Sequence, residues 1–245
     1  MIQSSFSTRQ YALLYAYFAK SILTSGHTNS FDILKSATRR YGYERGRRMA
    51  ERAQQAGDGD DFAAFLAYID WRPGIDWQFS GEMLPQFPVY SIEVNECGLH
   101  SVWSEFGLEQ YCSMYCDVFE TAIVQGFNPE LDLKLPCAIG KGNRICVFVY
   151  NGMSFSRQNL KRLTDLQDKL KNTCVRTWEQ HTAHLYHTFS QELVRILGQE
   201  EASAMVKKVL VSFGAVCSAQ EVKQLLSHTQ NVAYSFEAQR LDARG

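Results

Sequence analysis

Three short stretches in the middle of the chain decide the fold: VYSIEV at residues 89–94, LDLKL at 131–135 and ICVFVY at 145–150. Each shows the period-two alternation that is typical of a β-strand. Residues 102–125, between the first two stretches, have a helical pattern instead, and Gly126 is placed to end that helix. The sequence therefore predicts an α+β fold in which a small antiparallel sheet is packed with helices.

Helical patterns flank this middle part on both sides. On the N-terminal side they cover residues 8–23, 30–55 and 62–69, with Ser30 as a candidate N-cap of the second helix. After Asn151-Gly152 the pattern becomes helical again, with leucines at positions 160, 163, 166 and 170. We therefore expect an α+β domain over residues 1–152, followed by a helical extension over residues 153–245.

A short motif near the N-terminus has a counterpart in the extension. Leu14-Tyr15-x-x-Phe18 resembles Leu185-Tyr186-x-x-Phe189. The extension is therefore either a partial repeat of the N-terminal helices or a set of unrelated amphipathic helices with a common pattern.

The composition excludes several classes of protein. The 245 residues carry a net charge of −1, so no electrostatic attraction to nucleic acid or to an anionic membrane is expected. The N-terminus lacks the pattern of a secretory signal, and no apolar run is long enough to span a bilayer. The odd number of cysteines, seven, favours reduced thiols in the cytoplasm. We expect a cytoplasmic protein with neither a nucleic-acid nor a membrane partner.

Chemistry is indicated where the cysteines cluster, between residues 97 and 146. Cys112, Cys116 and Glu120 follow one another at spacings of four, which places them on one face of a helix. A thiol beside a second thiol and a carboxylate can be a nucleophile with its base, or part of a metal site. The alternative is that the two thiols are buried in the core, as free cysteines often are.

Two further features lie near this helix and on the second one. Asn128, held between Gly126 and Pro129, can aim its amide at a substrate oxygen or can form a helix-ending Asx turn. Glycines at 42 and 46 interrupt a helical pattern and suggest the close approach of another backbone or of a ligand. One face of the same helix can hold a substrate carboxylate or can be a solvated cationic face; it carries Arg45, Arg48 and Arg52.

Neither a metal nor another cofactor is expected. The motif His181-x-x-His184-x-x-His187 spreads its outer histidines over about 120° of a helix, and no cysteine or carboxylate completes a ligand set. A zinc-structured scaffold built from four cysteines ranks last, because the paired C-x2-C spacing is missing; these cysteines are Cys97, Cys112, Cys116 and Cys146.

The arrangement of these motifs resembles the L-2-amino-thiazoline-4-carboxylic acid hydrolase family over about residues 8–150. The resemblance is carried by Cys112-x3-Cys116 with Glu120, by Gly126-Phe127-Asn128-Pro129-x-Leu131, and by Gly142-x3-Cys146-x-Phe148. The upstream run Tyr41-Gly42-x-x-Arg45-Gly46-x-Arg48 resembles the helical N-terminal part of the same family.

The resemblance implies a hydrolase that opens a small cyclic amidine or amide, of the 2-amino-thiazoline-4-carboxylate kind, to an N-carbamoyl amino acid. It implies Cys116 as nucleophile or ligand, Glu120 as base, Asn128 as hydrogen-bond donor and an arginine of the second helix as carboxylate anchor. Cys112 and Cys146 complete the catalytic candidates. A non-catalytic small-molecule-binding or sensor protein of the same fold is the alternative, and the helical extension suggests a homo-oligomer.

Overall fold

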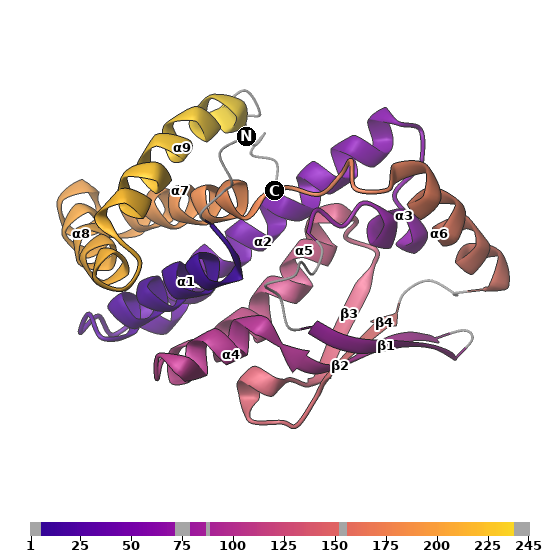
Figure 1. Ribbon diagram of the computed structural model, residues 1–245, viewed down its shortest axis with the longest axis horizontal. Coiled ribbons are helices and arrows are strands. Elements are labelled where there is room, and N and C mark those ends of the chain that lie inside the picture. Colours follow the sequence, from indigo (N-terminus) through magenta and orange to yellow (C-terminus); the bar gives the residue numbers. More distant parts are fainter. Residues whose placement is uncertain (1–5, 72–78, 87–88, 152–155, 238–245) are drawn as a thin grey trace.

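The predicted antiparallel sheet is present, and it has one strand more than expected (Figure 1). The computed structural model describes residues 6–71, 79–86, 89–151 and 156–237. Within them four strands are ordered β1-β2-β4-β3, and each neighbouring pair is antiparallel. The strands are β1 Phe79–Gln86, β2 Val89–Cys97, β3 Asp132–Cys137 and β4 Cys146–Asn151. Strand β1 was not predicted, because Gly81 and Pro85 mask its pattern, but proline is tolerated on an edge strand.

The three predicted N-terminal helices form close to their expected ends. They are α1 Thr8–Leu23, α2 Ser30–Gln55 and α3 Phe62–Ala67. Helix α1 begins with a capping box, in which Ser7 and Gln10 satisfy each other's backbone N–H groups. The N-cap of α2 is Asn29, and Ser30 is already the first helical residue.

The prediction of a single helix over residues 102–125 is wrong. The chain instead forms α4 Gly98–Glu105, a 3-10 turn at Glu109–Tyr111, a π-helical turn at Tyr115–Phe119 and α5 Glu120–Phe127. Gly107 has a φ of +61°, a left-handed conformation that ends α4. Gly126 does not end a helix either, since it lies within α5.

Helices α2 and α5 are in unusually close contact, as the glycines of α2 predicted. A Cβ atom at Gly46 would lie 2.0 Å from the carbonyl oxygen of Ile123, and one at Gly126 would lie 2.2 Å from that of Tyr43. Only glycine allows the two backbones to approach this far. The close contact brings Arg45 of α2 to the same cavity as Glu120 at the start of α5.

The C-terminal part consists of α6 Arg157–Leu170, α7 Trp178–Leu197, α8 Gln199–Val216 and α9 Ala219–Glu237. In Figure 1, α7, α8 and α9 gather with α1 on the side of α2 away from the sheet, and α6 lies beside α3. The two similar motifs meet in one core, where the rings of Phe18 and Phe189 are 5.1 Å apart. The domain boundary at residue 152 and the partial repeat stay predictions.

None of the helices in the described part of the chain is long and apolar enough to cross a membrane.

Candidate functional site

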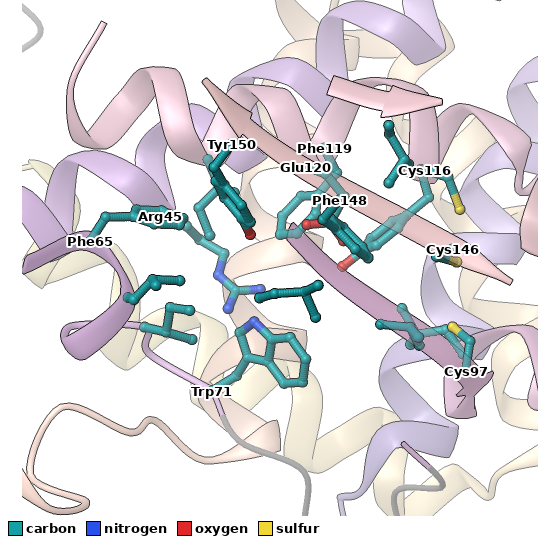
Figure 2. Close-up of a pocket in the computed structure, with 18 of the residues that line it drawn as sticks. Arg45, Phe65, Trp71, Cys97, Cys116, Phe119, Glu120, Cys146, Phe148 and Tyr150 are labelled. Carbon is teal, nitrogen blue, oxygen red and sulfur yellow. The ribbon is translucent and has the colours of Figure 1, made fainter. Parts of the chain in front are cut away.

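A cavity of about 290 Å³ lies between one face of the sheet and the helices around α5 (Figure 2). Successive side chains of a strand point to opposite faces, so alternate residues of two strands form one wall. These are Ile92 and Val94 on β2, and Cys146, Phe148 and Tyr150 on β4. The volume is near the lower end for small-molecule sites, so the cavity fits a small ring compound.

Glu120 supplies the acidic group among the described residues that line this cavity. It begins α5 directly after the π-helical turn, and such turns are frequent at functional sites. No described residue hydrogen-bonds its carboxyl group, and Figure 2 shows the side chain among Phe119, Phe148 and Tyr150. Burial raises the pKa of Glu120 to about 7, although Arg45 acts to lower it. A carboxyl group with this pKa can take and return a proton near neutral pH.

Arg45 supplies the basic group among the same lining residues. It is 2% exposed, donates a hydrogen bond to the carboxylate of Asp70, and lies 5.2 Å from the ring centroid of Phe119. Burial alone would lower the pKa of Arg45, but Asp70 outweighs that effect and raises it, so the guanidinium stays charged. Figure 2 shows it beside Trp71, pointing into the cavity.

Three thiols, those of Cys97, Cys116 and Cys146, gather at the other end of the cavity (Figure 2). The backbone N–H of Ile139 donates to the sulfur of Cys146 at 3.2 Å, and a Cβ at Gly140 would lie 2.8 Å from the sulfur of Cys116. Burial raises the pKa of all three thiols, that of Cys146 to about 11. Because their pKa values are raised, the three thiols are protonated at neutral pH and form an uncharged wall. The thiolate is the nucleophilic form of cysteine, so this protonation opposes nucleophilic attack by these residues.

Cys112 and Asn128 do not line the cavity. Cys112 is fully buried in the core, where its thiol donates to the carbonyl oxygen of Leu108 at 3.3 Å. The amide of Asn128 donates to the carbonyl oxygen of Asp60 at 3.0 Å and accepts from the N–H of Glu130 at 2.9 Å. These contacts match the structural roles that the sequence also allowed, a core thiol for Cys112 and an Asx turn for Asn128.

Arg48 and Arg52 also lie outside the cavity, because both face the C-terminal part of the chain. Arg48 donates to Nδ1 of His184 at 3.0 Å, and Arg52 donates to the carbonyl oxygen of Cys174 at 2.8 Å. The structure therefore brings together Arg45, Cys116, Glu120 and Cys146 from the predicted set, and places the other four elsewhere.

Several lining residues were missed in the sequence. Tyr150 was within reach, because it shares the strand alternation of Cys146 and Phe148. Asp70, which binds Arg45 and does not itself line the cavity, also carried a signal, since a single acid between Ile69 and Trp71 is unexpected in an apolar run. Trp178 lies in the extension, far from the cysteine cluster in sequence, and nothing local marks it.

The histidine motif of α7 serves the packing of helices. His184 donates from Nε2 to Glu44 at 2.8 Å, and His181 donates from Nε2 to the carbonyl oxygen of Asp70 at 3.0 Å. Burial lowers the pKa of both, that of His184 to about 3. Over the described ranges, no three His, Cys, Asp or Glu side chains are placed to hold a metal ion.

The fold and the cavity define a class of protein: an α+β protein with a mainly apolar small-molecule site, in which one carboxyl and one guanidinium are the charged groups of the described lining. The model of the L-2-amino-thiazoline-4-carboxylic acid hydrolase family matches residues 5–150, and the chain belongs to this family. The match ends in β4, so α6 to α9 lie beyond it. No curated protein and no solved structure gives a significant match.

Proposed function

We propose that this chain is a hydrolase that opens a small cyclic amidine or amide in the cavity to an N-carbamoyl amino acid. The observation that carries the proposal is the carboxyl group of Glu120, which has no hydrogen-bond partner among the described residues and a pKa of about 7. Family membership supports the same class of reaction. A buried carboxyl without a partner lowers stability, so its presence in a small-molecule cavity points to chemistry.

For a 2-amino-thiazoline ring, the reaction needs two proton transfers that one carboxyl group can perform. As the oxygen of water bonds to C2, Glu120 takes a proton from the water and returns it to the amidine nitrogen. Glu120 then takes the hydroxyl proton as the carbonyl forms, and passes it to the sulfur as the C2–S bond breaks. The product is a free thiol with a carbamoyl group on nitrogen. Proton transfer of this kind accelerates reactions by about 10²–10⁴-fold.

Arg45 is the anchor for a substrate carboxylate in this proposal. Of its five N–H donors, one on Nη2 binds Asp70, Nε has no hydrogen-bond partner among the described residues, and the group also faces the cavity. An arginine held by a carboxylate and by flanking aromatic rings is already oriented, so little further ordering is needed when a ligand binds.

Cys116 and Cys146 shape the cavity in this proposal, with no covalent step assigned to them. The raised pKa of each thiol opposes thiolate formation, and Glu120, the nearby acid, contributes to raising both values. A water molecule activated by Glu120 is the better nucleophile here.

The alternative is a binding or sensor protein that holds the same ligand without turnover. The protonated thiols and the largely apolar lining favour it, because such a cavity binds a ring compound without any further chemistry.

A panel of cyclic amidines with a C4 carboxylate, and of hydantoins and thiohydantoins with a carboxylate on the C5 substituent, separates the two. Release of thiol or of ureido product is measured with the wild type, with Glu120→Gln, and with Glu130→Gln as a control at an exposed glutamate. Turnover that Glu120→Gln loses and Glu130→Gln keeps supports the hydrolase. Thermal stabilisation by a compound that is never turned over supports the binder.

A further inference from the structure

Part of the cavity wall comes from outside the region that defines the family. Gln167 on α6 and Trp178 at the start of α7 both line the cavity, and both lie beyond residue 150, where the family match ends. The ring of Trp178 packs against that of Tyr11, another lining residue, with centroids 5.4 Å apart. The C-terminal helices therefore help to enclose the site.

The C-terminal part of the chain also forms hydrogen bonds to Asp70, the ion-pair partner of Arg45. The backbone N–H of Arg176 donates to the carbonyl oxygen of Asp70 at 2.8 Å, and Nε2 of His181 lies 3.0 Å from the same oxygen. Asp70 in turn binds Arg45. The residues Arg45, Asp70 and His181 are at most 2% exposed, so their contacts are shielded from solvent.

His181 is neutral in this arrangement, which fixes the direction of its hydrogen bond. Burial lowers the pKa of His181 well below its usual value, and the charge of Arg45 adds to the effect. A carbonyl oxygen only accepts, so Nε2 carries the hydrogen and donates it to Asp70. The ring of Trp178 packs on His181 with centroids 5.8 Å apart, which places this indole at the Arg45 end of the cavity.

We propose that the segment from Gln167 to His181 is the specificity-determining wall of the site. Trp178 and Gln167 limit the size of the group that a substrate carries beside its carboxylate, while Arg176 and His181 are positioning residues that orient Arg45 through Asp70. The inference rests on the proposed function for the identity of the substrate. It adds the class of compound selected: compact rings with a carboxylate and no bulky neighbouring substituent.

The size limit is tested with Trp178→Ala, Trp178→Phe and, as a control on the exposed side of α7, Gln191→Ala. The probes are two five-membered cyclic amidines with a C4 carboxylate, one unsubstituted and one carrying an additional C4 benzyl group. Dissociation constants are measured by calorimetry, and kcat/KM by product release. We expect Trp178→Ala to shift the preference toward the benzyl compound by about tenfold or more, and Trp178→Phe to shift it less. An unchanged ratio in folded Trp178→Ala overturns the inference.

The positioning role is tested at His181. His181→Leu removes the hydrogen bond to Asp70, whereas His181→Gln keeps a donor at a similar distance from the main chain. We expect His181→Leu to raise KM about tenfold with kcat within threefold, and His181→Gln to restore KM. A merely structural role would lower the amount of folded enzyme and leave KM unchanged, and that result contradicts the positioning role.

Failure of the proposed function gives a different pattern. A wild type that binds these compounds without turnover contradicts the hydrolase, and the wall is then judged from the calorimetric ratio alone. If neither compound binds to the wild type or to Trp178→Ala, both the proposed function and the wall are overturned.

Discussion

Two acidic side chains near Arg45, those of Asp70 and Glu120, differ in how they are paired. Asp70 is 1% exposed, pairs with Arg45 and has Arg48 3.6 Å from its second oxygen. Burial would raise the pKa of Asp70, but these cations outweigh it and lower the value far below the usual range. Glu120 is surrounded by apolar side chains, and burial raises its pKa to about 7.

The contrast indicates that pairing with a cation decides whether such an acid keeps its charge or changes protonation near neutral pH. A paired carboxylate keeps its charge at every pH that the protein meets, so Asp70 can hold helices together and orient Arg45. An unpaired one changes protonation near neutral pH, so Glu120 can move protons. The same guanidinium, that of Arg45, links the two groups, because it binds one and faces the cavity that contains the other.

The largest expected effect is on catalysis at Glu120. Replacing it by Gln keeps the size of the side chain and removes the acid, so kcat should fall by about 10²–10⁴-fold. Binding of the unreacted ring compound, measured by calorimetry, should change much less. A Glu120→Gln variant with the activity of the wild type would contradict the role given to this group.

Replacement of Asp70 should act mainly on the stability of the fold. Asp70→Asn leaves the buried cation of Arg45 without its counter-charge, which should lower the free energy of unfolding by about 3–5 kcal/mol. Urea denaturation measures this, with Glu51→Gln on the outer face of α2 as the control. If Asp70→Asn unfolds like the wild type, the ion pair is not the structural element that its burial indicates.

The contact of α2 with α5 is what brings Arg45 close to Glu120, and Gly46 tests it. A Cβ here meets the backbone of Ile123, so Gly46→Ala should destabilise by about 1–3 kcal/mol even though alanine favours helices. Lys35→Ala on the exposed side of α2 should be close to neutral in the same thermal unfolding experiment. A stabilised Gly46→Ala variant would show that the helices can separate without loss.

The smallest effect is expected at Cys116. Its thiol is protonated at neutral pH, so Cys116→Ala should keep kcat within about threefold while KM changes slightly through the altered cavity wall. A loss of about 100-fold or more, measured in folded protein, would instead make Cys116 the nucleophile and Glu120 its base.

Much of the fold was visible in the sequence because local patterns encode it. The alternation in residues 89–94, 131–135 and 145–150 located three of the strands. The glycines of α2 indicated the close approach of another backbone. The break at Gly107 and the π-helical turn were not visible, because both depend on how residues 98–127 pack between α1, α2 and the sheet. Long-range packing overrides a continuous helical pattern.

The site was predictable to the extent that it follows one helix face and one strand face. Cys116 and Glu120 were candidates from helical spacing, Cys146 from the motif Gly142-x3-Cys146-x-Phe148, and Arg45 from its place in the arginine helix; all four line the cavity. Cys112 was a candidate on the same spacing and Asn128 through its place between Gly126 and Pro129, yet each makes its hydrogen bonds away from the cavity. Trp178 lines the same cavity but lies far along the chain from the other candidates, so no local sequence pattern connects it to the site.

The most direct test of the contrast between the two carboxyl groups is the stability of Glu120→Gln relative to the wild type across pH. Folding raises the pKa of Glu120 from about 4.5 to about 7, so the folded wild type binds the proton more tightly than the unfolded chain and loses stability as pH rises through that window. The glutamine variant has no such loss. We expect its free energy of unfolding, by urea denaturation, to match the wild type near pH 5 and to exceed it by about 2–3 kcal/mol at pH 8. Two curves that stay parallel from pH 5 to pH 8 would contradict a raised pKa at Glu120 and remove the basis of the proposed chemistry.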